Sequence, residues 1–208
     1  MLNADVLTFQ EFAMHESLPL SKIHQAVLEF LQGREDVVLF GAQAVNAYVS
    51  EPRMTQDVDL LSTRAKDLAE ELRETLNQQF HIAVRVREIG EGKGFRLYQV
   101  RTEGNRHLVD LRAVSELPNS ETIENIKILS PLELIVSKVI SYQSRRGNPK
   151  SGTDWRDLGV LLLRFPELKE RVGETLKARN VSEEVLKTWA EIEGLSFEFD
   201  DKDQDLIF

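Results

Sequence analysis

Residues 37–60, VVLFGAQAVNAYVSEPRMTQDVDL, decide the fold of this chain. The apolar run predicts a short buried strand over 36–40, and Gly41 ends it. The small residues that follow predict a closely packed helix over 42–50, and a second short strand is predicted over 58–61. The stretch therefore reads as a strand, a tight turn, a helix and another strand.

Two carboxylates at the second strand carry the chemistry of this stretch. Successive side chains of a strand alternate between its faces, so Asp57 and Asp59 share one face while Val58 and Leu60 point to the core. Two carboxylates on one face can hold a divalent metal. Backbone N–H groups at the Gly41 turn, together with the start of the helix, can face a phosphate. The order of these parts predicts a site that handles nucleotides.

A third carboxylate, Asp110, stands between Val109 and Leu111 in a predicted strand over 106–112. A carboxylate in mid-strand is costly to bury unless it is paired or bound to a metal. On adjacent strands, the three aspartates could converge on one or two Mg²⁺ ions. The Asp-x-Asp spacing alone is weak evidence, because the acidic tail repeats it over 201–205. Asp57 and Asp59 differ from the repeats in the tail because they lie at a predicted strand, after the Gly41 turn and before a third strand carboxylate.

The rest of the chain predicts an α+β fold, with a mixed β-sheet flanked by helices and followed by a C-terminal helical region. Helices are predicted over 21–32, 65–79, 131–146, 154–164, 167–178 and 182–192, and further strands over 81–88, 95–101 and 106–112. Strand signals fade after residue 113. We expect an α/β domain with an N-terminal helix over 1–115, and a helical region with an acidic C-terminal tail over 116–208.

Composition narrows the class of protein. The chain has 208 residues, 41% of them hydrophobic, which is enough for one large domain or two small ones. The absence of cysteine excludes disulfides and thiolate metal sites and agrees with a reducing cytosol. No apolar run approaches the roughly 18 residues of a membrane helix. No basic and then apolar leader pattern opens the sequence. We therefore expect a cytoplasmic protein.

The net charge of −9 argues against broad nucleic-acid binding. A local basic patch is still compatible with it, and the group to test for RNA is Arg145, Arg146, Lys150 and Arg156. Acidic residues gather in the tail over 197–208, which we expect to be a solvated end or an edge for a partner.

The stretch GAQAVNAYVSEPRMTQDVDLL resembles the nucleotidyltransferase superfamily that includes DNA polymerase beta. It is most similar to the small prokaryotic branch that contains the abortive-infection AbiEii-like proteins and their type IV toxin relatives. That branch has a glycine turn, a short helix, an Arg-x-Thr-x-Asp-x-Asp segment and a later strand carboxylate. The matching residues here are Gly41, Arg53, Thr55, Asp57, Asp59 and Asp110. A weaker likeness covers a lysine-bearing helix with Lys138 and Arg145, and the segment from Asp154 to Leu158 that contains Asp157.

The resemblance implies a nucleotidyltransferase-like sheet followed by helices that close a nucleotide cleft. It implies transfer of a nucleoside monophosphate from an NTP to an RNA or protein acceptor, with release of pyrophosphate and with Mg²⁺ or Mn²⁺ as cofactor. It also implies that the chain could be a toxin with a cognate antitoxin. The implied metal ligands and catalytic residues are Asp57, Asp59 and Asp110. The implied nucleotide-binding residues are Gly41, Ala42, Gln43, Arg53, Thr55, Lys138, Arg145, Asp154 and Asp157.

Several alternatives stay open at this point. Ala42 replaces a serine that contacts phosphate in many active members, which leaves room for a catalytically silent nucleotide-binding module. A plain protein-interaction domain with solvated acidic residues is a third hypothesis. His107 is expected to face away from Asp110, because the two are three residues apart on a strand.

The basic residues have two readings each. Lys138 and Arg145 share one helix face and could meet a triphosphate, or they could be part of a solvated face. Asp154 and Asp157 could position these two cations, or could simply lie near a positive helix start. Arg53 could reach a phosphate or pair with a neighbouring carboxylate.

Overall fold

A computed structural model of the chain describes residues 18–197. The chain divides into two compact units, Met1–Ser130 and Pro131–Phe208. The Asp-x-Asp repeats over 201–205, and with them nearly all of the acidic tail, lie outside the described residues.

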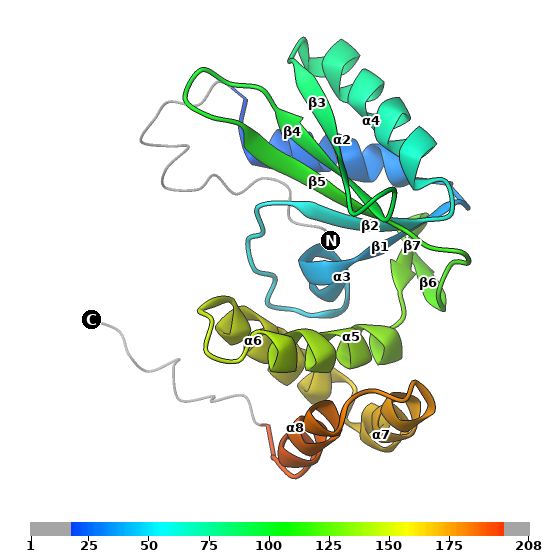
Figure 1. The fold of residues 1–208 in the computed structure, drawn as a ribbon, viewed down its shortest axis with the longest axis vertical. Helices are drawn as coiled ribbons and strands as arrows, with labels where there is room; N and C mark the ends of the chain where they lie inside the picture. The colour runs from blue at the N-terminus through cyan, green and yellow to red at the C-terminus, as the bar shows by residue number, and fades with distance from the viewer. Residues whose placement is uncertain (1–17, 198–208) are drawn as a thin grey trace. The chain divides into compact units, whose positions relative to one another are not determined.

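The first unit is built on one mixed seven-stranded sheet with the strand order β3-β4-β5-β2-β1-β7-β6 (Figure 1). The strands β2 and β5, and likewise β1 and β7, pair in parallel, and the other neighbours are antiparallel. The described elements of this unit are α2 (Leu20–Leu31), β1 (Val37–Phe40), α3 (Gly41–Tyr48), β2 (Val58–Ser62), α4 (Ala65–Phe80), β3 (Val84–Ile89), β4 (Gly94–Gln99), β5 (Arg106–Ala113), β6 (Ser120–Ile123) and β7 (Ile126–Leu129).

The hairpin of β6 and β7 differs from the expectation that strand structure ends near residue 113. Its two turn residues, Glu124 and Asn125, both have positive φ, at 50° and 62°. A two-residue turn with positive φ at both positions matches the right-handed twist of the two strands that it joins. The hairpin joins the sheet through Ile128, which pairs with Leu39 of β1. The two strands are short, and a partner distant in sequence completes them, so local periodicity gave little sign of them.

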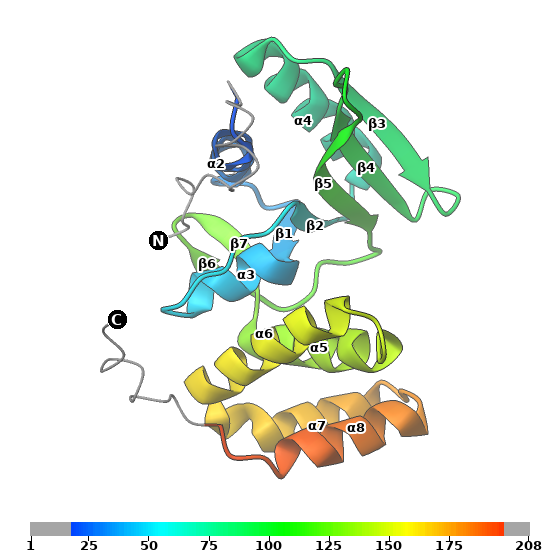
Figure 2. The ribbon, with the colours of Figure 1, turned by 90° about the vertical axis from the view of Figure 1, so that its left-hand side faces the viewer.

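The helices of the first unit cover both sides of the sheet. Figure 2 shows α2 and α4 on one side and α3 on the other. The side chains of Val58 and Leu60 are fully buried, as expected, and Leu68, Leu72 and Leu76 form the buried face of α4. Because α2 and α4 take up the apolar face, the polar side chains of the central strands point to the opposite face.

The second unit is helical throughout its described part. It contains α5 (Pro131–Ser144), α6 (Lys150–Arg164), the 3₁₀ turn η1 (Pro166–Leu168), α7 (Lys169–Ala178) and α8 (Glu183–Glu193). The helix α5 packs against α6, α7 and α8, and buried leucines and isoleucines such as Leu134 and Leu161 fill the space between them. In the described residues of both units, no helix has the length and apolar character needed to cross a membrane.

Candidate active site

One row of paired residues crosses five strands on the face opposite to α4. Asp59 of β2 pairs with Phe40 of β1 on one side and with Asp110 of β5 on the other. Asp110 in turn pairs with Arg96 of β4, and Arg96 with Arg87 of β3. Paired residues of neighbouring strands point to the same face. The tertiary structure therefore brings two of the predicted carboxylates side by side.

Gly41 lies directly against Asp59. Its φ of 70° lies in the left-handed region, and a Cβ atom placed on it would lie 2.0 Å from Oδ2 of Asp59. Only glycine combines this backbone conformation with so close an approach. The predicted glycine turn and the predicted carboxylate are thus two halves of one local arrangement.

His107 joins the carboxylates, so the expectation that it faces away from Asp110 is wrong. The pairing of β4 with β5 shifts by one residue between Leu97 and Tyr98, which leaves Leu108 as an extra residue in β5. A bulge of this kind reverses the alternation of side chains. His107 consequently lies on the face of Asp110, while Leu108 is buried.

Asp57, His107 and Asp110 form a cluster whose ligand atoms all lie within 4.8 Å of one another. Nδ1 of His107 lies 3.2 Å from Oδ2 of Asp57. This hydrogen bond raises the pKa of the His107 imidazole above its usual value, although burial acts in the opposite direction. Sequence reasoning missed His107 because no local signal marks the bulge.

The donor set of this cluster fits a divalent cation, since carboxylate oxygens and an imidazole nitrogen are both common metal ligands. Arg96 would compete with a cation for one oxygen of Asp110, because Nε of Arg96 donates to Oδ1 of Asp110 over 2.8 Å. That contact uses one oxygen of Asp110 and leaves Oδ2 for a cation. Asp59, the register neighbour of Asp110, adds a carboxylate beside the cluster.

The loop before β2 is held by hydrogen bonds within the first unit. The side chain of Asn46 in α3 accepts from the backbone N–H of Arg53 over 3.0 Å and donates to its carbonyl oxygen over 2.8 Å. Oγ1 of Thr55 donates to the carbonyl oxygen of Asp57 over 3.1 Å. Gln43 is buried beside Asn46. Asn46 was not among the predicted residues, although it fixes the loop that carries three of them, Arg53, Thr55 and Asp57.

The second unit contains a buried ion cluster that joins α5 to α6. Nζ of Lys138 lies 2.7 Å from Oδ2 of Asp157 and 3.3 Å from Oδ1 of Asp154. Arg145 donates to the other oxygen of Asp154 over 2.8 Å. Lys138 is only 7% exposed, so the solvated-face interpretation is wrong for this residue. Asp154 positions both cations, and Asp157 positions Lys138. That these four residues bind nucleotide stays a prediction.

The basic group expected to contact RNA is largely neutralised by carboxylates. Arg145 pairs with Asp154, Arg146 with Glu191 over 2.6 Å, and Arg156 lies 3.6 Å from Asp157.

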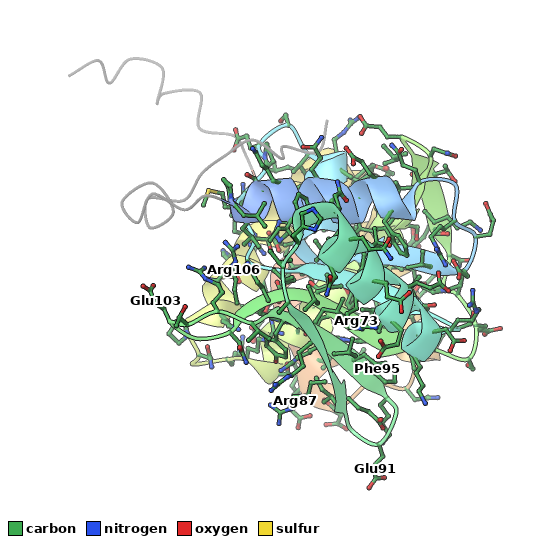
Figure 3. All side chains as sticks on the ribbon, turned by 90° about the horizontal axis from the view of Figure 1, so that it is seen from above. Arg73, Arg87, Glu91, Phe95, Glu103 and Arg106 are labelled. Carbon is green, nitrogen blue, oxygen red and sulfur yellow. The ribbon has the colours of Figure 1, made fainter. Side chains whose placement is uncertain are left out.

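Uncompensated positive charge lies instead on the sheet of the first unit. Within residues 18–197, Arg85 and Arg87 form no ion pair or hydrogen bond, and both are exposed. Figure 3 shows Arg87 on the side of the β3–β4 hairpin away from α4, whereas Phe95 lies on the side of the hairpin that faces α4. Arg87 and Arg96 are direct cross-strand partners, and Asp110 compensates the charge of Arg96. The charge of Arg87 opposite it has no such partner among the described residues.

Comparisons with known proteins agree with this architecture. The profile of the family described as "Nucleotidyl transferase AbiEii toxin, Type IV TA system" matches residues 25–206. No curated protein matches the chain. The solved structure of JHP933 from Helicobacter pylori is 13% identical with a TM-score of 0.52, over 90% of this chain and 90% of that one.

Two further structures share the fold. ANT(2″)-Ia in complex with adenylyl-2″-tobramycin is 16% identical with a TM-score of 0.53, over 84% of this chain and 100% of that chain. The Megavirus polyadenylate synthase is 13% identical with a TM-score of 0.51, over 85% of this chain but 37% of that one. At these identities the likeness is one of fold, and it confirms the expected α+β architecture.

Proposed function

The chain belongs to the AbiEii family of nucleotidyltransferase toxins, and from this premise we propose that it is a metal-dependent enzyme. It transfers a nucleoside monophosphate from an NTP to an acceptor. The acceptor oxygen forms a bond to the α-phosphorus, the bond from that phosphorus to the β-phosphate oxygen breaks, and pyrophosphate leaves with that electron pair.

The observation that carries the proposal is the cluster of Asp57, His107 and Asp110, whose ligand atoms lie within 4.8 Å of one another. Asp59 is not in that cluster, but it is the register neighbour of Asp110 and lies against the turn at Gly41. Asp57, Asp110 and His107 would hold a divalent cation, with the carboxylate of Asp59 beside them. When bound, such an ion neutralises charge on the phosphates and stabilises the attacking and leaving oxygens.

The chain's own groups would orient the substrates. The backbone amides of Ala42 and Gln43 follow the Gly41 turn at the start of α3, where unpaired N–H groups and the helix dipole favour a phosphate. A side chain at Gly41 would displace Asp59, so glycine keeps phosphate and carboxylate within reach of each other. Asp110 would accept the proton of the attacking hydroxyl, with Arg96 fixing its orientation.

Of the two acceptor classes, RNA and protein, the arginines of β3 favour RNA. Arg85 and Arg87 are exposed and uncompensated, although the chain as a whole carries a net charge of −9. They belong to the same face as the aspartates, because Arg87, Arg96 and Asp110 lie in one row. Guanidinium groups there would bind a phosphate backbone.

The experiment is incorporation of α-labelled NTPs into total RNA or protein, with each of the four NTPs and with Mg²⁺ or Mn²⁺. We expect labelled RNA, and we expect Asp57→Ala to abolish labelling while its circular dichroism spectrum stays native. Asp67→Ala is the matched control, since Asp67 is an exposed acid in the first turn of α4. Full activity of Asp57→Ala would refute the metal assignment, and label found in protein alone would refute the RNA acceptor.

A catalytically silent nucleotide-binding module is the second candidate, and Ala42 at the phosphate turn is the observation that favours it. Thermal shifts separate the two: nucleotide-dependent stabilisation without incorporation indicates binding alone.

A toxin role adds a cellular test. Induced expression should arrest growth, and Asp57→Ala should relieve the arrest.

A further inference from the structure

We propose that His107 is a nitrogen ligand of the cation site and that it makes the site prefer Mn²⁺ to Mg²⁺. This inference rests on the proposed function and names the metal class that the site would take.

The first support is geometric. His107 lies on the face of Asp110 only because Leu108 is an extra residue in β5. The bulge brings an atom of His107 within 4.8 Å of carboxylate oxygens from both Asp57 and Asp110. A bulge beside a site commonly redirects one side chain into it, as happens here.

The second support is the fixed orientation of the ring. Nδ1 of His107 donates to Oδ2 of Asp57 over 3.2 Å, whereas Nε2 is buried without a hydrogen-bond partner. The ring of Tyr98 packs against the imidazole with 5.1 Å between centroids and 31° between planes. Nδ1 is therefore the nitrogen that faces the carboxylates. A cation bound there would replace the proton that Nδ1 donates to Asp57, and the neutral ring would then carry its proton on Nε2.

The third support is ligand chemistry. Mg²⁺ is a hard cation that takes oxygen ligands in near-ideal octahedral geometry. Mn²⁺ also suits carboxylates, but as a first-row transition-metal ion it binds a nitrogen ligand more readily than Mg²⁺ does. A site made only of aspartates would serve both ions. Replacing one oxygen by Nδ1 of His107 favours Mn²⁺ over Mg²⁺.

The test is Mn²⁺ binding to the full chain, followed by electron paramagnetic resonance, with Mg²⁺ as competitor. We expect a pulsed spectrum with a ¹⁴N coupling from the imidazole, and Mn²⁺ bound more tightly than Mg²⁺. His107→Asn should remove the coupling and weaken Mn²⁺ binding about tenfold or more. The affinity for Mg²⁺ should change much less, because the Asn amide still offers an oxygen.

His81→Asn is the matched control, since His81 is an exposed histidine at the end of α4 and should behave like the native chain. Mn²⁺ bound without nitrogen coupling, and with an unchanged Mn²⁺-to-Mg²⁺ ratio in His107→Asn, would overturn this inference and leave the proposed function standing. Failure of the native chain to bind either ion would overturn both, as would labelled-NTP incorporation that persists in the presence of a chelator.

Discussion

Gly41 and Asp59 are matched to each other. The left-handed backbone of Gly41, with φ of 70°, brings its Cα so near Asp59 that a Cβ atom would lie 2.7 Å from Cγ and 2.0 Å from Oδ2 of that carboxylate. Since real Cβ atoms do not approach other atoms so closely, the pair tolerates no side chain at position 41.

We therefore predict that Gly41→Ala lowers NTP transfer at least about 100-fold, since small displacements of catalytic groups have effects of that size. The control is Gly147→Ala, because Gly147 has a similar φ of 82° with no atom near its Cβ position. Both variants should lose about 1 kcal/mol of stability through the backbone. Only the first should lose activity in the labelling assay. Native activity of Gly41→Ala would contradict the role given to Asp59.

The buried ion cluster of the second unit predicts a large loss of stability. Lys138→Met leaves Asp154 and Asp157 buried without their shared cation, so the free energy of unfolding should fall by about 3 kcal/mol. Lys187→Met, which removes an exposed pair with Glu183, should change it by less than about 0.5 kcal/mol. Urea denaturation measures both.

A second variant separates charge burial from lost packing. Lys138→Met combined with Asp157→Leu should recover part of the lost stability, because an apolar pair can replace a buried ion pair. A double variant as unstable as the sum of its single variants would show that the cluster is not coupled as the distances indicate.

The arginines of β3 predict how RNA binding depends on salt. Replacing Arg85 and Arg87 together with Gln should weaken binding of single-stranded RNA and reduce the slope of log affinity against log salt by about 1.4, at about 0.7 per phosphate contact. Arg73→Gln is the control, since Arg73 lies on α4 and is already paired with Glu70 over 2.6 Å. Equal slopes for the native chain and the double variant would remove β3 from the RNA surface.

The carboxylate of Asp36 predicts a pH dependence of stability. Arg34 donates to both of its oxygens over 3.0 Å, and Arg64 adds a third contact, so the pKa of Asp36 is held below its ordinary value of 3.8. A carboxylate with a lowered folded-state pKa stabilises the protein above its unfolded-state pKa. The stabilisation is lost as the pH falls through the folded-state value.

Asp36→Asn should therefore destabilise the protein by about 1 to 2 kcal/mol at neutral pH. The difference from the native chain should narrow below about pH 4. Asp67→Asn, at a side chain that is 66% exposed, should show little effect at either pH. Urea denaturation across this pH range gives the result, and a constant difference would show that the Asp36 charge is not what stabilises the fold.

The sequence by itself determined the local geometry of the central motif. The tight turn at Gly41 and the alternation from Asp57 to Leu60 depend on the chain within a few residues, and backbone sterics and the strand period fix them. The close approach of Gly41 to Asp59 came only with the folded sheet. The strand, turn, helix and strand of 37–60 and the α+β class followed from the same local rules. The hairpin of β6 and β7 did not, because its strands are short and it joins the sheet through the pairing of β7 with the distant strand β1.

Only the tertiary structure decided which side chains meet. The bulge at Leu108 arises in the pairing of β5 with β4, a strand that is distant in sequence from Asp57, and it turned His107 toward Asp57. Lys138 lies in a buried cluster because α6 packs on α5 and brings its aspartates to that lysine. Side-chain charge can be read from a sequence, but its neutralisation depends on partners that are far apart in the chain, and only folding brings those partners together.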